Sequence, residues 1–212
     1  EVNSWLQQTG ARVLWRDSRM KNVLMPAHGL MLGGPTCPLA NIQAPPMHQP
    51  EPQDPEGLAL LLVSGGSTGT PKLIPRSHND YLCCLRLSSQ RCGIEARHRY
   101  LCLLPSAHNF ALASPGILGF WQAAACVVLS DEAMPKAQIQ LLERFKITHT
   151  ALVPAQALAW LNSCGKEPAL AGITEGVQLQ VGGAPLDAAT ALALENQLGV
   201  RLQQVFGMAE GL

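Results

Sequence analysis

Between residues 100 and 205 the sequence alternates short apolar runs with longer, partly polar segments. The apolar runs at residues 100–104, 126–129, 148–153, 177–181 and 201–205 predict strands. Helices are predicted between them, over residues 111–124, 136–145, 155–162 and 187–198. This alternation predicts an α/β fold with a largely parallel sheet and flanking helices. Because ligands of such folds bind beyond the carboxyl ends of strands, the segments after residues 63, 104, 181 and 205 are the first candidates for a site.

Composition limits the classes of function. The 212 residues suffice for one large domain or part of a larger one, and a hydrophobic content of 47% with only 14% charged residues supports a packed core. Lys plus Arg and Asp plus Glu number 15 each, which does not indicate a nucleic-acid-binding surface. No apolar run approaches the length of a membrane span, and the start does not resemble a signal peptide. Seven cysteines without a C-x-x-C pair are typical of reduced thiols in the cytoplasm.

The first 57 residues are less regular than the rest. Short strands are predicted at residues 11–15 and 22–25. Prolines at positions 45, 46, 50, 52 and 55 predict an extended connector before the next apolar run. The chain begins with Glu1 rather than Met, as a fragment would.

The apolar run Leu58–Val63 predicts a buried strand that leads into a polar loop. The loop is Ser64-Gly65-Gly66-Ser67-Thr68-Gly69-Thr70-Pro71-Lys72, with three glycines, four hydroxyl side chains and a lysine. Glycines allow backbone N–H groups to approach an anion closely, so this composition predicts a phosphate-binding loop. It is not a Walker A loop, because Pro71 precedes Lys72 and a second strand is predicted to follow. A polar hairpin turn is the alternative interpretation.

Polar residues also follow the strand predicted at 100–104. His108 and Asn109 offer a donor and an acceptor for a carboxylate or an aromatic hydroxyl. If the next turn is helical, Phe110 and Ser114 lie on one face, although Pro115 opposes this unless it sits in a first turn or at a kink. The alternative is a capping Asn109 beside a structural His108.

Two further loops carry candidate residues. Gly182, Gly183 and Ala184 follow a predicted strand, where two glycines permit a flat ligand to approach or simply make a turn. The segment Phe206-Gly207-Met208-Ala209-Glu210 follows the last strand, and its Glu210 alone would be an ordinary solvated charge. His78, just after the phosphate-binding loop, either contacts phosphate or caps a helix with Asn79.

Together these motifs resemble the adenylate-forming superfamily of acyl-CoA synthetases, luciferases and peptide-synthetase adenylation domains. The run Leu73-Ile74-Pro75-Arg76-Ser77-His78-Asn79-Asp80-Tyr81 resembles the stand-alone aryl-acid adenylating enzymes of siderophore biosynthesis, which activate 2,3-dihydroxybenzoate or salicylate. The resemblance runs from about residue 58 to residue 212. It implies that this chain is part of the large N-terminal domain of such an enzyme.

The resemblance implies a role for each candidate. The loop residues Ser64, Gly65, Gly66, Ser67, Thr68, Gly69 and Thr70 would hold ATP phosphates together with the catalytic Lys72. Gly183 and Ala184 would flank adenine and the acyl pocket, and Phe206 would pack on adenine beside Gly207 and Met208. Glu210 would be catalytic by binding Mg²⁺. Ala209 stands where the superfamily commonly has Thr, a departure that the aryl-acid subgroup shares, and it has no expected side-chain role.

The aryl acid would bind among His108, Asn109, Phe110, Ser114 and Gly182. Asn109 would contact the 2-hydroxyl and Phe110 would form a wall. Ser114 would meet a 3-hydroxyl, which favours 2,3-dihydroxybenzoate, whereas Phe110 stands where dihydroxybenzoate enzymes often have Tyr and so favours salicylate. On balance 2,3-dihydroxybenzoate is favoured.

The implied reaction makes aryl-AMP and pyrophosphate from ATP and an aryl acid, in the cytoplasm. The aryl group then passes to the phosphopantetheine thiol of an aryl-carrier protein, with no membrane or nucleic acid involved. The alternatives are a salicylate-AMP ligase, another aryl-CoA ligase, or a catalytically incomplete nucleotide-binding fragment.

The resemblance also implies a division of the chain. Residues 1–57 would be a partial N-terminal segment and Pro-rich connector, and residues 58–212 the central part of the adenylation core. The C-terminal lid domain with its catalytic Lys would be absent. The chain alone is therefore expected to be inactive.

Overall fold

The computed structural model describes residues 13–15, 30–32, 54–64 and 72–211. The chain divides into two compact units, residues 1–53 and residues 54–212. In the first unit, β1 (Val13–Trp15) pairs in parallel with β2 (Leu30–Leu32). β1 falls within the strand predicted at 11–15, whereas the strand predicted at 22–25 lies outside the described residues.

The second unit begins with a hairpin. β3 (Leu58–Ser64) pairs antiparallel with β4 (Lys72–Ser77), and Ser64 lies opposite Lys72 in the register. The strand predicted at 58–63 and the strand predicted after the loop are therefore both present. β3 pairs with no strand of the parallel sheet among the described residues, so the loop after residue 63 does not follow a strand of that sheet, contrary to expectation.

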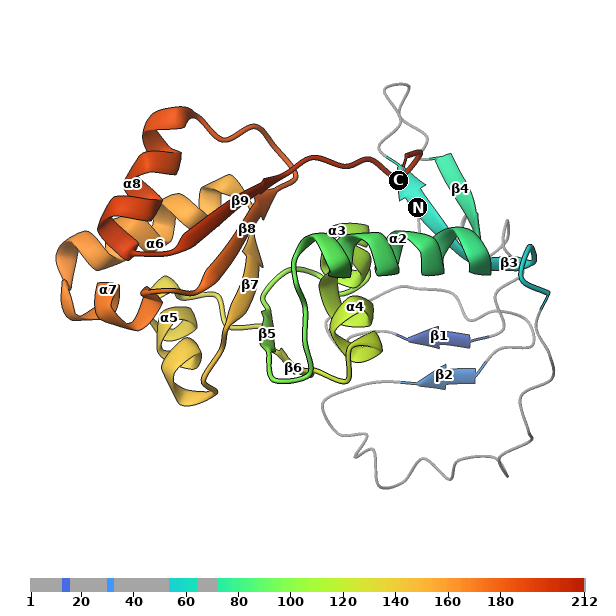
Figure 1. Ribbon diagram of the computed structural model, residues 1–212, viewed down its shortest axis with the longest axis horizontal. Helices are drawn as coiled ribbons and strands as arrows, with labels where there is room; N and C mark the ends of the chain where they lie inside the picture. The colour runs from blue at the N-terminus through green and yellow to red at the C-terminus, as the bar shows by residue number, and fades with distance from the viewer. Residues whose placement is uncertain (1–12, 16–29, 33–53, 65–71, 212) are drawn as a thin grey trace. The chain divides into compact units, whose positions relative to one another are not determined.

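A five-stranded sheet of parallel strands forms the centre of this unit, in the order β6-β5-β7-β8-β9 (Figure 1). The strands are β5 (Arg99–Cys102), β6 (Cys126–Leu129), β7 (His149–Leu152), β8 (Gln178–Gly182) and β9 (Arg201–Val205). The predicted α/β class with a largely parallel sheet and flanking helices is confirmed. β5 ends two residues before the predicted Leu104.

Helices pack on both faces of the sheet (Figure 1). They are α2 (His78–Arg91), α3 (Asn109–Ala113), α4 (Gly116–Gln122), α5 (Pro135–Arg144), α6 (Pro154–Lys166), α7 (Ala169–Thr174) and α8 (Ala188–Leu198). Side chains of a strand alternate between its two faces. Accordingly, Leu101 packs with apolar residues of α5 to α8, whereas its neighbours Tyr100 and Cys102 pack with α3 and α4.

The helix predicted over residues 111–124 is in fact two helices. α3 ends at Ala113, Ser114 has a non-helical backbone (φ −129°, ψ 60°), and α4 begins at Gly116. Pro115 explains the break, because it has no N–H to donate and its ring disfavours helical geometry in the preceding residue. Phe110 and Ser114 therefore do not share the face of one continuous helix. The sequence placed them on one face only if the turn after Phe110 was helical, and Pro115 prevents this.

The core between the sheet and helices α5 and α6 contains a hydrogen-bonded chain of polar groups around Trp160. Trp160 is fully buried, and its Nε1 donates to Gln138 Oε1 at 2.7 Å. The amide of Gln138 in turn donates to the Glu132 carbonyl oxygen at 2.7 Å. Buried polar atoms cost stability unless they are paired, so this chain of bonds lets Trp160 fill the core without a penalty.

Aromatic rings fill the core between α4 and the sheet. Phe120 stacks on Tyr100 with ring centroids 4.9 Å apart and meets the His149 ring edge-on at 5.2 Å. The His98 ring lies 4.5 Å from that of His149. Burial, and secondarily the neighbouring His98, lowers the pKa of His149 from about 6.5 to about 4.

Acidification is expected to destabilise the fold through His149. Between pH 6.5 and pH 4 the unfolded chain binds a proton at this residue that the folded chain does not, so stability is lost as pH falls through this window. We expect His149 to lower the free energy of unfolding by about 1–2 kcal/mol between pH 7 and pH 5. Urea unfolding at both pH values should show a correspondingly smaller pH effect in His149→Gln. An equal pH effect in both proteins would contradict this assignment.

The six described cysteines, at positions 83, 84, 92, 102, 126 and 164, are free thiols. Among the described helices none is both long and apolar enough to cross a membrane.

Candidate active site

The predicted phosphate-binding loop is held at both ends by the β3–β4 hairpin. Ser64 is buried and Lys72 is exposed, and the two residues face each other in the last pair of the ladder. Gly65, Gly66, Ser67, Thr68, Gly69 and Thr70 lie outside the described residues, so their role stays a prediction. The pairing of β3 with β4 places Lys72, the last residue of the motif, opposite Ser64, its first residue.

The junction between β4 and α2 is fixed by local contacts. Ser77 caps α2, since its Oγ accepts from the Asp80 backbone N–H at 3.2 Å. Arg76 is buried, and its Nε lies 2.8 Å from Asp80 Oδ2, close enough for an ion pair although the alignment is not that of a hydrogen bond. His78 is the first residue of α2 and the side chain of Asn79 donates to Glu56 Oε1 at 2.6 Å, so neither is the cap that the sequence suggested.

His108 and Asn109 lie at the start of α3. The sequence offered Asn109 as a possible helix cap, but the cap is His108. His108 is the cap of α3, since its Nδ1 accepts from the Phe110 backbone N–H at 3.2 Å. The side chain of Asn109 does not cap the helix. Its Oδ1 accepts a hydrogen bond from the hydroxyl of Tyr81 at 2.8 Å. The sequence did not indicate this role of Tyr81, because nothing in it links Tyr81 to a residue 28 positions away.

Phe110 and Gly182, which the resemblance assigns to the aryl-acid pocket, lie against each other. A methyl group at Gly182 would lie 3.1 Å from Cζ of Phe110 and 3.0 Å from the carbonyl oxygen of Val205. Only glycine therefore lets the Phe110 ring lie flush against the end of β8. The contact joins α3 to the ends of β8 and β9.

Gly183 and Ala184 follow directly and are exposed. Gly183 has a φ of +84°, a conformation that glycine adopts without strain, and the side chain nearest to it is that of Val153. Gly183 and Ala184 are thus exposed residues that directly follow the residue in contact with the Phe110 ring.

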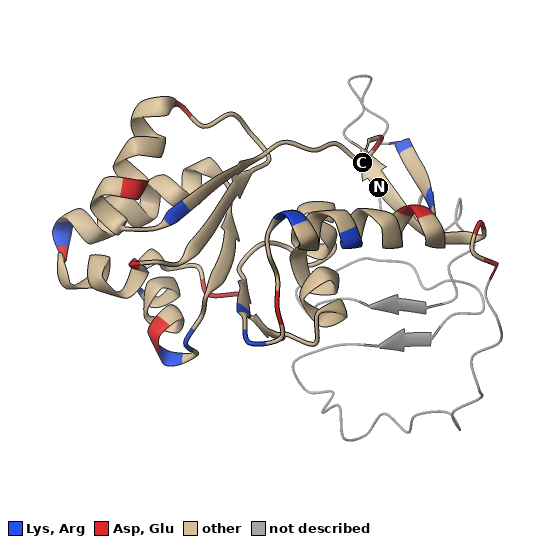
Figure 2. Ribbon diagram, viewed as in Figure 1, with Lys and Arg blue, Asp and Glu red and all other residues tan. Residues whose placement is uncertain are grey.

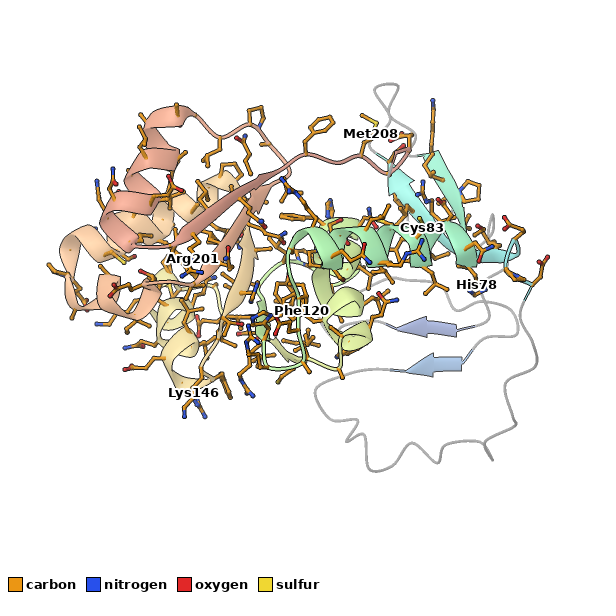
Figure 3. All side chains as sticks on the ribbon, viewed as in Figure 1. His78, Cys83, Phe120, Lys146, Arg201 and Met208 are labelled. Carbon is orange, nitrogen blue, oxygen red and sulfur yellow. The ribbon has the colours of Figure 1, made fainter. Side chains whose placement is uncertain are left out.

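The segment after β9 returns toward the hairpin (Figures 1 and 3). Ala209 packs against the apolar cluster of Leu62, Tyr81, Leu85 and Ala113, which joins β3, α2 and α3. The flanking side chains of Met208 and Glu210 are exposed. Phe206 is 90% exposed, an unusual cost for a large apolar ring unless a ligand or another part of the protein covers it.

Ser114 is half-buried in the bend between α3 and α4. Its hydroxyl makes no hydrogen bond to another described residue. The helix break therefore places Ser114 in the connection to α4 rather than one turn beyond Phe110 on α3.

Few charged residues lie near the carboxyl ends of the sheet strands. Strands β7 and β8 carry no Lys, Arg, Asp or Glu, and the charged residues lie mainly on helices and loops (Figure 2). Among the described residues no three His, Cys, Asp or Glu side chains gather as a metal site. Lys72 and Glu210 are thus the charges that the candidate site offers within the described part of the chain.

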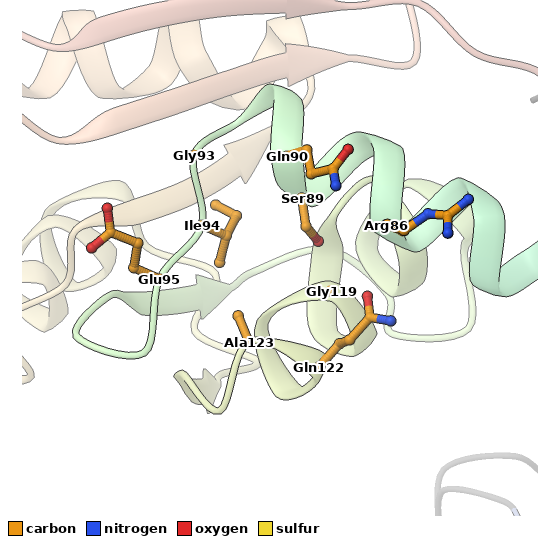
Figure 4. Close-up of a pocket in the computed structure, with 9 residues that line it drawn as sticks. All are labelled: Arg86, Ser89, Gln90, Gly93, Ile94, Glu95, Gly119, Gln122 and Ala123. Atoms are coloured by element: carbon orange, nitrogen blue, oxygen red, sulfur yellow. The ribbon is translucent and has the colours of Figure 1, made fainter.

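A separate pocket of about 280 Å³ lies at the other end of α2, against α4 (Figure 4). Its lining includes Arg86, Ser89, Gln90, Glu95 and Gln122. None of the predicted site residues lines it, so it is not the candidate site.

The sequence profile of the family described as AMP-binding enzyme matches residues 7–212. The chain belongs to the AMP-binding enzyme family. It is 50% identical over 159 residues to the vibriobactin-specific 2,3-dihydroxybenzoate-AMP ligase of Vibrio cholerae, covering 75% of this chain and 29% of that protein. It is also 47% identical over 161 residues to a salicyl-AMP ligase / salicyl-S-ArCP synthetase of Mycobacterium tuberculosis, covering 76% of this chain and 28% of that protein.

The chain is also similar to a solved structure. The apo structure of Mycobacterium smegmatis MbtA has a TM-score of 0.70 and 44% sequence identity, over 80% of this chain and 31% of that chain. The predicted relationship to adenylate-forming enzymes is therefore confirmed. The chain spans less than a third of the length of these relatives.

Proposed function

We propose that the full-length protein is an aryl-acid AMP ligase that prefers 2,3-dihydroxybenzoate, with salicylate as the alternative substrate. The observation that carries the proposal is the contact of Phe110 with Gly182, which sets an aromatic ring, next in sequence to the Asn109 amide, against the uncharged edge at the end of β8. Such an edge suits a flat aromatic acid, since aromatic rings pack well on one another. The named activities of the two relatives support the same class of substrate.

The reaction joins two substrates at this edge. A carboxylate oxygen of the aryl acid attacks the α-phosphorus of ATP, a P–O bond forms, and the bond to the bridging oxygen breaks as pyrophosphate leaves. Catalysis of such a displacement depends on positioning the reactants and stabilising charge on the phosphate oxygens. We assign the β- and γ-phosphates to the loop that ends at Lys72. We assign adenine to Phe206, with Gly183 and Ala184 beside it.

Glu210 is the residue that fits Mg²⁺. An exposed carboxylate suits an ion that takes its other ligands from phosphate and water, and ATP held by the proposed phosphate-binding loop would supply the phosphate. When bound, Mg²⁺ neutralises part of the charge on the triphosphate. The packing of Ala209 on the hairpin cluster supports this assignment, because it ties the segment that carries Glu210 to the strands that carry the loop.

The division of the chain remains part of the proposal. We place residues 58–212 in the centre of an adenylation core, preceded by a partial N-terminal segment and connector at residues 1–57. The small share of the relatives' length that the chain spans supports this placement. Adenylation is therefore to be measured on the full-length protein.

The acceptor of the aryl group distinguishes an enzyme that loads a carrier protein from an aryl-CoA ligase. We propose the phosphopantetheine thiol of an aryl-carrier protein, in the cytoplasm, and the name of the mycobacterial relative supports it. When the full-length protein is incubated with each acceptor in turn, the aryl group should be transferred to the carrier protein and not to coenzyme A. Formation of aryl-CoA without carrier loading would favour the alternative.

ATP–pyrophosphate exchange tests the proposal itself. The full-length protein should support exchange with 2,3-dihydroxybenzoate most strongly, then salicylate, with benzoate weak and a fatty acid inactive. Preference for salicylate would mean that Phe110 rather than Ser114 governs selection. Exchange with the fatty acid but with no aryl acid would exclude the proposed function.

Gly182→Ala is expected to raise KM for the aryl acid about tenfold, with a smaller effect on KM for ATP. The added methyl group meets the Phe110 ring at 3.1 Å and the Val205 carbonyl oxygen at 3.0 Å, so the ring must shift into the space proposed for the substrate. Gly172→Ala is the control, since a methyl group there meets nothing within 4 Å. An unchanged KM in Gly182→Ala would place the aryl acid elsewhere.

A further inference from the structure

The hydrogen bond between Tyr81 and Asn109 joins two elements of the candidate site. Tyr81 lies on α2, in the first turn after the hairpin, and Asn109 is the first residue of α3. The Tyr81 hydroxyl donates to Asn109 Oδ1 at 2.8 Å. An amide group carries its oxygen and its NH₂ on opposite sides, so this bond turns the Nδ2 donor away from Tyr81. Among the described residues Asn109 Nδ2 donates no hydrogen bond.

The position of Tyr81 is fixed from several directions. Its side chain is only 5% exposed and packs in the cluster with Leu62, Leu85 and Ala113. The start of α2 is held by the Ser77 cap and by the ion pair between Arg76 and Asp80. Burial raises the pKa of Tyr81 to about 12, so the phenol remains protonated and able to donate.

We propose that Tyr81 is a positioning residue that holds the Asn109 amide with its NH₂ toward the substrate, so that the site selects aryl acids whose ortho substituent accepts a hydrogen bond. The inference rests on the proposed function, which places the aryl acid beside Asn109 and Phe110. Tyr81 itself need not touch the substrate. It acts by excluding the flipped amide, which would present an acceptor instead.

This orientation has a chemical consequence for the choice of substrate. In 2-hydroxybenzoates the ortho hydroxyl donates its proton to the neighbouring carboxylate, which leaves the hydroxyl oxygen as an acceptor for Asn109 Nδ2. In 2-aminobenzoate the nitrogen lone pair is delocalised into the ring, so the amino group donates and barely accepts. Two donors then face each other, and a buried donor without a partner is costly.

The test compares salicylate with 2-aminobenzoate, which differ only in the ortho group. In pyrophosphate exchange by the full-length protein, we expect kcat/KM to favour salicylate by about 100-fold. Tyr81→Phe should reduce this preference to about tenfold or less, because the amide of Asn109 is then free to turn over. A ratio of two substrates is unaffected by a general loss of active protein, so a merely structural role of Tyr81 would not change it.

Tyr100→Phe is the matched control. Tyr100 is also buried, lies on β5 in the core below α4, and its hydroxyl has no hydrogen-bond partner among the described residues. Removing this hydroxyl should leave the substrate ratio unchanged. A double-mutant cycle adds a second check: in an Asn109→Ala background, Tyr81→Phe should have no further effect on the ratio.

Asn109→Asp tests the same idea without altering Tyr81. A carboxylate only accepts, so this variant should shift the preference toward 2-aminobenzoate, whichever oxygen Tyr81 engages. The added charge weakens binding of both acids and cancels in the ratio. An unchanged preference for salicylate in Asn109→Asp, or in a folded Tyr81→Phe, overturns the inference.

The outcome for the wild-type protein separates this inference from the proposed function. Exchange with neither acid, nor with 2,3-dihydroxybenzoate, contradicts the function. Equal exchange with salicylate and 2-aminobenzoate leaves the function standing and contradicts the role of Tyr81.

Discussion

Glu210→Gln in the full-length protein is expected to lower kcat for aryl-adenylate formation by about 100- to 1,000-fold, or about 3–4 kcal/mol of transition-state stabilisation. The substitution removes a charge and keeps the shape of the side chain. Glu210 is exposed and makes no ion pair among the described residues, so the fold should be as stable as before. The loss should therefore appear in the rate and not in the thermal midpoint.

Glu195→Gln is the control for this prediction, because Glu195 is an exposed glutamate on α8 whose side chain forms no ion pair among the described residues. It should leave the rate unchanged. Raising the Mg²⁺ concentration should partly restore Glu210→Gln, since a weaker site fills at higher concentration. Full activity of Glu210→Gln at low Mg²⁺ concentration would remove Glu210 from the proposed site.

Gly116→Ala is expected to destabilise the fold by about 3 kcal/mol or more. Gly116 has a φ of +50°, which strains any residue with a side chain. A methyl group there would also overlap the carbonyl oxygen of Ala111, a residue with no exposed surface. Since neither backbone segment can move freely, the connection between α3 and α4 must distort. Urea unfolding of the full-length protein measures the effect.

Gly176→Ala separates the two contributions. Gly176 also has a positive φ, of +74°, but a methyl group there meets nothing within 4 Å. The control should therefore lose only about 1 kcal/mol, from backbone strain alone. Equal losses in the two variants would mean that the overlap with Ala111 is relieved without cost. Because α3 carries Asn109 and Phe110, Gly116→Ala should also weaken aryl-acid binding at temperatures where the protein is still folded.

The parallel sheet could be predicted from the sequence because its strands are short apolar runs bounded by helices. The strands at 126–129 and 201–205 have the predicted bounds. The other three strands differ from their predicted bounds by one or two residues at an end, where no apolar pattern marks the last hydrogen bond. The helix α7 was missed, since six residues are too few to show a helical period.

The candidate site was predicted less completely, and the reason is distance along the chain. Phe110 and Gly182 were both identified from their positions after strands, and the structure brings them into contact. The contact between Tyr81 and Asn109 depends on how α2 packs on α3, which no local pattern contains. Ser114 was placed on a helix because Pro115 was treated as compatible with a kink, whereas the chain stops one helix and starts another. The phosphate-binding role of residues 65–71 stays a prediction.

A single-turnover experiment shows directly whether the protein adenylates an aryl acid. The full-length protein is mixed with excess ATP, Mg²⁺ and labelled 2,3-dihydroxybenzoate, then quenched with acid and separated. We expect the label to appear in an aryl-adenylate in an amount equal to the active enzyme, together with pyrophosphate. Recovery of all the label as free acid, under conditions where ATP is bound, would contradict it.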